Sequence, residues 1–70
     1  MITIRFKSGQ QNRRLKADSA AVNDGILELY VYTKDRTKLQ MANSFSAKDV
    51  RWALLDNGTY VVGDAEHRYD

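Results

Sequence analysis

The sequence of 70 residues contains no cysteine and no proline. Without cysteine the chain can form no disulfide and no thiolate metal site, and it has no cysteine nucleophile. This composition is typical of a reducing compartment, so we expect a cytoplasmic location. The only histidine, His67, lies in a polar C-terminal stretch and has no second imidazole with which to share a metal ion. We therefore expect no metal and no cofactor.

Long apolar runs are also missing from the chain. No segment approaches the roughly 18 consecutive apolar residues of a membrane-spanning helix. The N-terminal residues, Met1–Arg5, lack the apolar core of a secretory signal peptide. These two absences predict a protein that has no membrane association.

Motifs for catalysis are absent as well. The four glycines are isolated, at positions 9, 25, 58 and 63, so there is no glycine-rich phosphate-binding loop. The aspartates lie mostly in predicted turns, where such side chains usually accept hydrogen bonds from nearby backbone amides. A chain of this size also has little room for a desolvated pocket. We therefore expect a protein that is not an enzyme.

The residues that are present form an ordinary globular composition, 43% hydrophobic and 29% charged. A chain of this length is sufficient for one domain with a modest core. We assign residues 1–62 to a single domain and residues 63–70 to a polar C-terminal tail.

The most strand-like segment is Gly25–Thr33, which we place at the centre of a small β-sheet. Apolar residues alternate here with more polar ones, which is the period of a strand with one buried face. The inward residues are Leu27, Leu29 and Val31, and the outward residues are Glu28, Tyr30 and Tyr32. The preceding Asn23-Asp24-Gly25 sequence tolerates positive φ and predicts a tight turn.

A polar turn at residues 33–37 leads into a second alternating run, Lys38–Ala42. We expect the two runs to form an antiparallel hairpin whose register satisfies both apolar patterns. The buried pairs are then Val31 with Leu39 and Leu29 with Met41, and the outward pairs are Tyr32 with Lys38 and Tyr30 with Gln40.

The N-terminal segment predicts another hairpin. Ile2, Ile4 and Phe6 alternate with polar residues, and a turn follows at residues 8–11. In the next strand Leu15 and Ala17 face inward. Residues 20–22 either continue this strand or form a short separate one.

Residues 43–62 fit two interpretations. Residues 43–49 form a connection in which Phe45 closes one end of the core, and Ser46 with Asp49 resembles a helix-capping box. A helix over residues 46–56 would end at Gly58. A strand beginning at Val50 is the interpretation that we favour, followed by a hairpin turn at residues 56–58 and a last strand at residues 59–62. The strand places Val50, Trp52 and Leu54 on one inward face, with Trp52 in the core.

Together these elements predict an all-β or mostly β fold with one short helical turn. We expect a small antiparallel meander of five to six strands curled into a barrel. Three segments resemble the SH3-like or Sm-like small β-barrels of bacterial and phage proteins. They are FKSG at residues 6–9, VNDGILEL at residues 22–29 and SAKDV at residues 46–50, and the resemblance spans residues 2–56. It implies a fold and nothing about catalysis.

The N-terminal hairpin is rich in positive charge, with five basic residues and no acidic residue in residues 1–17. Burial of Ile4 with Leu15 leaves four of these bases on one outer face: Arg5, Lys7, Arg14 and Lys16. A simple register sets Arg5 directly opposite Arg14, which is an unfavourable like-charge pair. Such a face either binds an anion, in nucleic acid or on an acidic protein surface, or is merely solvated and screened by salt.

Two tyrosines supply a second candidate site. Tyr30 and Tyr32 lie beside Lys38 on the outer face, a combination that suits stacking of unpaired bases or anchoring of a protein partner. The alternative is that both rings pack against neighbouring turns. Glu28 on the same face would repel a phosphate backbone and counts against nucleic acid.

We therefore expect a non-catalytic binding module. The leading hypothesis is protein–protein interaction, including self-association, by an accessory or inhibitor protein of a phage or mobile element that acts on a host protein in the host cytoplasm. The alternative is a nucleic-acid-binding small barrel. The predicted binding residues are Arg5, Lys7, Arg14, Lys16, Tyr30, Tyr32 and Lys38.

Overall fold

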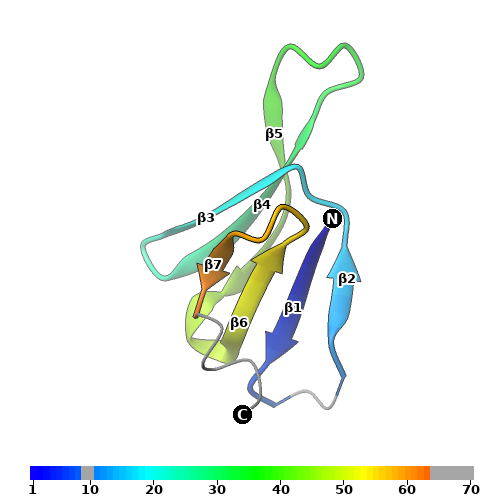
Figure 1. Ribbon diagram of the computed structural model, residues 1–70. Helices are drawn as coiled ribbons and strands as arrows, with labels where there is room; N and C mark the ends of the chain where they lie inside the picture. Colours follow the sequence, from blue (N-terminus) through cyan, green and yellow to red (C-terminus); the bar gives the residue numbers. More distant parts are fainter. Residues whose placement is uncertain (9–10, 64–70) are drawn as a thin grey trace.

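The computed structural model describes residues 1–8 and 11–63 of the chain. This part consists of β-strands, turns and one 3₁₀ turn, so the expected mostly β fold is confirmed (Figure 1). The strands form two antiparallel sheets. Their bounds are β1 Ile2–Phe6, β2 Arg13–Leu15, β3 Ser19–Asn23, β4 Ile26–Tyr32, β5 Leu39–Ser46, β6 Val50–Leu55 and β7 Tyr60–Val62, with the 3₁₀ turn at Ala47–Asp49.

The first sheet has the strand order β2-β1-β6-β7. β1 pairs with β2 on one side and with β6 on the other. The predicted meander of five to six strands is therefore wrong for the described residues, which form seven strands. Residues 13–15 and 19–23 are separate strands, and β1 is paired with a strand from the far end of the chain. Ile2 and Ile4 of β1 are fully buried, as their alternation predicts. The strand interpretation of the segment that begins at Val50 is confirmed, since β6 pairs with β1 and continues through a turn into β7.

The second sheet has the strand order β3-β4-β5. Residues 19–23 form the separate strand β3, which a two-residue turn joins to β4. Asp24 (φ 51°) and Gly25 (φ 75°) both have positive φ, which is the requirement of a type I′ hairpin turn. Leu27 and Leu29 of β4 are fully buried. The predicted central strand is therefore confirmed together with its turn.

One hydrophobic core joins the two sheets. Phe6 and Phe45 pack against it, with ring centroids 5.2 Å apart in an edge-to-face arrangement. The predicted packing of Phe45 against the core is confirmed. The buried members of this core are Ile2, Ile4, Ala17, Leu27, Leu29, Val50 and Ala53.

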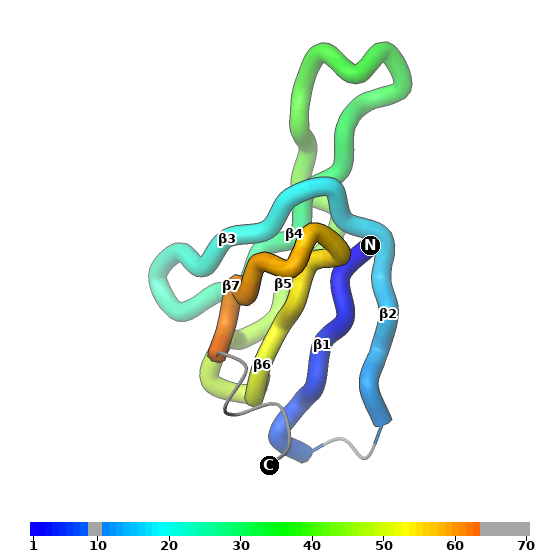
Figure 2. The backbone as a smooth tube through the Cα atoms, in the orientation of Figure 1, coloured from blue at the N-terminus to red at the C-terminus, as the bar shows by residue number. Residues whose placement is uncertain are grey.

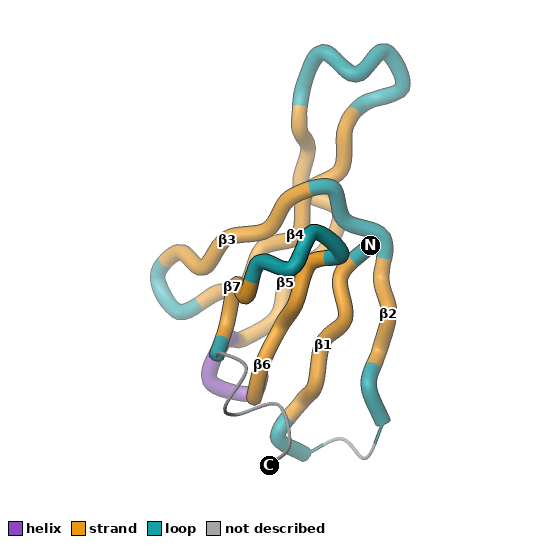
Figure 3. The backbone as a smooth tube through the Cα atoms, viewed as in Figure 1, coloured by secondary structure: helices purple, strands orange, loops and turns teal. Residues whose placement is uncertain are grey.

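Two predictions for the segment before β6 are wrong. Residues 43–46 belong to β5 and do not form a connection (Figure 3). Ser46 precedes the 3₁₀ turn, but its side chain makes no capping hydrogen bond, so the capping box is not formed. The physical reason is the length of the turn, because three residues do not build the row of free N–H groups that an α-helix presents to a cap.

A β-bulge determines the face on which Trp52 lies. Arg51 is an extra residue in β6 relative to β1. As a result Val50 and Ala53 share the core face, and Trp52 lies on the opposite face of the sheet. The predicted common inward face of Val50, Trp52 and Leu54 is therefore wrong, although Trp52 is only 2% exposed.

The second sheet extends beyond the packed region. The outer parts of β4 and β5, with the turn between them, project away from the other strands (Figure 1, Figure 2). We call residues 31–42 the arm. In the described residues no backbone pairing connects the two sheets, so closure of the strands into a barrel is not found.

Candidate protein-interaction arm

The strand register of the arm differs from the predicted one by one residue. The observed pairs are Tyr32 with Leu39, Val31 with Gln40 and Tyr30 with Met41. The predicted pairs, which were Val31 with Leu39, Leu29 with Met41, Tyr32 with Lys38 and Tyr30 with Gln40, are wrong. A one-residue shift exchanges the two faces of a strand. Leu39 and Met41 therefore lie on the outer face beside the tyrosines.

The turn at the tip of the arm explains this shift. The Thr33 N–H donates to the Lys38 carbonyl at 2.9 Å, which closes the hairpin around residues 34–37. Asp35 Oδ1 accepts hydrogen bonds from the Thr33 hydroxyl (2.6 Å), the Thr37 hydroxyl (2.7 Å) and the Thr37 N–H (3.1 Å). These bonds, led by the one from Thr33, lower the pKa of Asp35 to about 2. Turn chemistry therefore sets the register of the arm.

The outer face of the arm carries an apolar strip, which we define as Tyr32, Leu39 and Met41. Tyr32 and Leu39 are each 45% exposed, and Met41 is 54% exposed. Tyr32 lies directly opposite Leu39, and Met41 is the next outward residue of β5, so the three side chains are neighbours. Single exposed apolar residues are normal on protein surfaces, whereas a group of them on a projecting hairpin is typical of an interaction surface.

A basic tip borders the apolar strip. Lys34, Arg36 and Lys38 carry three positive charges in the turn, against the single negative charge of Asp35. Arg36 has a positive φ of 59°, and its guanidinium lies 5.7 Å from the centroid of the Tyr32 ring. This cation–π contact directs one positive charge of the tip back over the strip.

Hydrogen bonds fix the base of the arm to Asp18, in the connection between β2 and β3. The Tyr32 N–H donates to Asp18 Oδ2 (2.9 Å), and the Asp18 N–H donates to the Tyr30 carbonyl (2.8 Å). Glu28 accepts hydrogen bonds from the Asn23 amide (2.7 Å) and the Tyr30 hydroxyl (2.8 Å), which lower the pKa of Glu28 and raise the pKa of Tyr30. Tyr30 is thus held within the sheet, whereas Tyr32 presents its ring to solvent.

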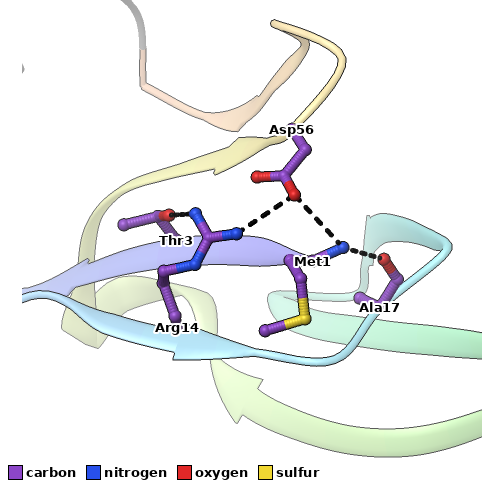
Figure 4. A network of polar contacts seen from close by, with 5 residues as sticks. All are labelled: Met1, Thr3, Arg14, Ala17 and Asp56. Atoms are coloured by element: carbon purple, nitrogen blue, oxygen red, sulfur yellow. Dashed lines mark hydrogen bonds and ion pairs between the residues drawn. The ribbon is translucent and has the colours of Figure 1, made fainter.

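Arg14 in the N-terminal hairpin pairs with Thr3, so the predicted opposition of Arg5 and Arg14 is wrong. β2 begins only at Arg13, and the longer connection moves Arg14 past Arg5. The Arg14 guanidinium donates to Thr3 Oγ1 (3.3 Å) and forms an ion pair with Asp56 (3.1 Å; Figure 4). The charge of Arg14 is therefore compensated within the chain.

The other predicted bases do not converge on one site. Arg5 shares the face of Arg14, as the parity of the pairing predicts, and it is half-buried opposite Trp52. Lys7 and Lys16 are exposed. Within the ranges that the structure describes, none of these three bases forms an ion pair. The remaining predicted residues lie in the second sheet and its turn: Tyr30, Tyr32 and Lys38.

Four residues of the arm surface were not predicted from the sequence: Leu39, Met41, Lys34 and Arg36. One available signal is the Thr-Lys-Asp-Arg-Thr run at residues 33–37, because an aspartate between two threonines is typical of a turn closed by side-chain hydrogen bonds. A second signal is the absence of charge from Leu39 to Ser46.

Other parts of the described chain offer little for small-molecule chemistry. An open cavity of about 160 Å³ lies beside the N-terminus and is smaller than the roughly 300–1,000 Å³ of a typical ligand pocket. Across residues 1–8 and 11–63, no cluster of three or more His, Asp or Glu side chains is placed to hold a metal ion. Within the same ranges, no helix has the length and apolar character that crossing a membrane requires. The arm is the strongest candidate site in this part of the chain.

Comparison with known proteins adds no family assignment. A scan against protein-family models finds no matching model. Searches of curated proteins and of solved structures find no significant match.

Proposed function

We propose that this protein is a non-catalytic protein-binding module that contacts its partner through the arm. The observation that carries the proposal is the apolar strip, in which three large side chains are 45–54% exposed on a projecting hairpin. Aromatic residues, methionine and arginine are enriched in protein interfaces, and the strip with the neighbouring Arg36 supplies all three. A tyrosine held by a cation–π contact also loses little conformational freedom when it becomes an anchor.

The proposal extends to the setting in which the module acts. We propose an accessory or inhibitor protein of a phage or mobile element that covers a surface of a host protein in the cytoplasm. The small size and the lack of cysteine support this setting. We further propose that the two sheets, which share one core, are the halves of an SH3-like or Sm-like barrel.

Affinity capture with paired variants tests the role of the strip. The Leu39→Ser/Met41→Ser variant removes two apolar side chains from the arm, and the Val22→Ser/Ile26→Ser variant removes two from elsewhere on the same sheet, where Val22 is 41% and Ile26 is 38% exposed. We expect a protein that is retained by the wild type and the Val22/Ile26 variant and released by the Leu39/Met41 variant. Equal retention by all three proteins would exclude the strip as the binding surface.

Nucleic-acid binding is the second candidate function, and the basic tip is the observation that favours it. Arg36 lies over the exposed Tyr32 ring, and the exposed Lys34 and Lys38 belong to the same turn, a combination that suits phosphate contacts with base stacking. Charge-reversal of Lys34 and Lys38 would then abolish binding of single-stranded RNA or DNA, and binding would weaken steeply with added salt. Binding that is unaffected by the charge reversal and by added salt would reject this alternative.

A further inference from the structure

The free edge of β5 is unusually open to strand pairing. Among the strands that the structure describes, β5 lies at the edge of its sheet, and none of its eight residues is charged. Natural edge strands are usually protected by charged residues, proline, a β-bulge, short length or a cover. Of these devices β5 has only a bulge, which lies at Ala42 between the pairs Tyr30–Met41 and Leu29–Asn43. The part of β5 that lies in the arm is therefore an exposed pairing surface.

The backbone of the arm shows which groups face this edge. The Tyr32 N–H donates to Asp18, on the side of β4 away from β5, and the Lys38 carbonyl accepts from Thr33 across the hairpin. Backbone groups alternate in direction along an antiparallel strand. The N–H and C=O groups of Leu39 and Met41 therefore point outward from β5, and those of Gln40 point toward β4.

We propose that a second copy of this chain adds to the free edge of β5, antiparallel and about a twofold axis at Gln40. Leu39 of each copy then lies opposite Met41 of the other, and the two residues exchange backbone hydrogen bonds. Gln40 lies opposite Gln40 of the second copy. This register uses all four outward-facing backbone groups of Leu39 and Met41, and it is self-complementary, as a twofold interface requires.

The distribution of side chains and charges favours a second copy as the occupant. The outer-face residues Leu39 and Met41 of both copies come together as one apolar cluster across the axis. The basic tips lie on opposite sides of it, and even their nearest cations, the two Lys38 residues, are about 14 Å apart at roughly 3.4 Å per residue. This separation exceeds the Debye length of about 8 Å at physiological salt, so the two like-charged tips are screened from each other.

The dimer extends the proposed function and rests on it in one respect, because the arm that forms the dimer also carries the apolar strip that contacts the partner. Pairing uses the edge of β5, whereas a partner protein contacts the outer face of the sheet. Dimerisation therefore leaves the strip accessible and joins two strips into one larger surface. The two proposals consequently predict separable effects of mutation.

Sedimentation velocity on the full chain over a wide concentration range tests the dimer. Met41→Pro removes the outward N–H at an edge position where proline is compatible with a strand, and Met41→Ala is the matched control that retains the N–H. We expect Met41→Pro to weaken self-association about tenfold or more relative to Met41→Ala, since two interchain hydrogen bonds are lost per dimer. Both variants should retain the far-UV circular dichroism of the wild type.

A charge-swap pair tests the position of the twofold axis. Gln40→Lys and Gln40→Glu each place like charges opposite one another and should weaken the homodimer up to about fivefold. Mixing the two variants should restore association, because opposite charges then meet at the axis. Recovery in the mixture supports the proposal even if Met41→Pro fails to fold.

Two outcomes would overturn the dimer. One is a wild-type chain that stays monomeric at every concentration, and the other is a dimer that is insensitive to the Met41→Pro and Gln40 variants. A monomer that still captures a partner through Leu39 and Met41 rejects the dimer and leaves the proposed function intact. The opposite result is a dimer that is weakened by Met41→Pro and by the Gln40 variants, while partner capture is unchanged by Leu39→Ser/Met41→Ser. That result supports the dimer and rejects the proposed function.

Discussion

The two halves of β4 differ in what determines the direction of their side chains. In the first half, Leu27 and Leu29 are fully buried, and the alternating pattern alone identifies the inward face. In the second half the strand leaves the core, and Tyr32 is 45% exposed. There the hydrogen bonds of the Asp35 turn select the register and turn Leu39 and Met41 outward. Apolar residues in the packed region are therefore buried in the core, whereas Tyr32, Leu39 and Met41 in the arm remain exposed to solvent.

The sharpest way to test this contrast is to truncate one apolar residue in each region. Ile4→Ala opens a cavity in the core and should lower the free energy of unfolding by about 2–5 kcal/mol. Leu39→Ala removes a residue that is already 45% exposed and should change it by no more than about 0.5 kcal/mol. Urea denaturation followed by circular dichroism measures both. A large loss of stability from Leu39→Ala would mean that the arm packs against other parts of the chain.

The next largest loss of stability is expected from a substitution at Gly63, where the backbone packs closely against β6. A Cβ at Gly63 would lie 2.9 Å from the Arg51 carbonyl oxygen and 3.0 Å from Trp52 Cβ, and Gly63 has a positive φ of 75°. We expect Gly63→Ala to destabilise the fold by about 1–3 kcal/mol.

Gly58→Ala is the matched control for this change. Gly58 also has a positive φ, 92°, but a Cβ at this position would have no neighbouring atom within 4 Å. Gly58→Ala should therefore introduce the backbone strain without the steric clash, so its melting temperature should be higher than that of Gly63→Ala. Equal melting temperatures would indicate that the contact of Gly63 with β6 is unimportant.

A smaller effect is expected from the ion pair in the N-terminal hairpin. Arg14 and Asp56 are 3.1 Å apart, but both side chains are more than half exposed. We expect Arg14→Ala to cost about 0.2–1 kcal/mol, and the cost should shrink at high salt. Denaturation at two salt concentrations measures this dependence. A salt-independent loss would point to the hydrogen bond with Thr3 as the larger contribution.

The smallest effect on global stability is expected at the tip of the arm. The folded-state pKa of Asp35 is about 2, below its ordinary value of 3.8, because the threonine hydrogen bonds favour the carboxylate. The stabilisation is therefore complete above pH 4 and is lost as the pH falls toward 2. An NMR titration of the Thr37 amide should follow this change. Asp35→Ala should abolish the titration with little change in the melting temperature, and an unchanged titration curve would reject the assignment to Asp35.

The sequence predicts the packed region well and the arm poorly, for a physical reason. Ile2, Ile4, Leu27 and Leu29 alternate because one face of each strand must be buried, so pattern and structure have the same cause. In the arm no core selects a face, and an alternating pattern there is compatible with either register. The bulge at Arg51 is equally hard to predict, because an inserted residue reverses the faces of the strand without changing the hydrophobic pattern.

The candidate site was predicted in part. Tyr32 and Lys38 do lie on the arm, but the strip could not be foreseen from a register that buried Leu39 and Met41. The predicted opposition of Arg5 and Arg14 was wrong because the pairing depends on the length of the connection between β1 and β2, which the sequence does not specify. Long-range partners such as Asp56 for Arg14 depend on the packing of distant strands and have no local signal.

Residue-resolved amide hydrogen exchange along the arm tests the central claim most directly. In dilute protein the Gln40 N–H, directed toward β4, should be protected, and the N–H groups of Leu39 and Met41 should exchange rapidly. At high concentration the last two should become protected as the second copy pairs with the edge. Protection of Leu39 and Met41 in dilute protein, with an open Gln40, would contradict both the register and the exposed apolar strip.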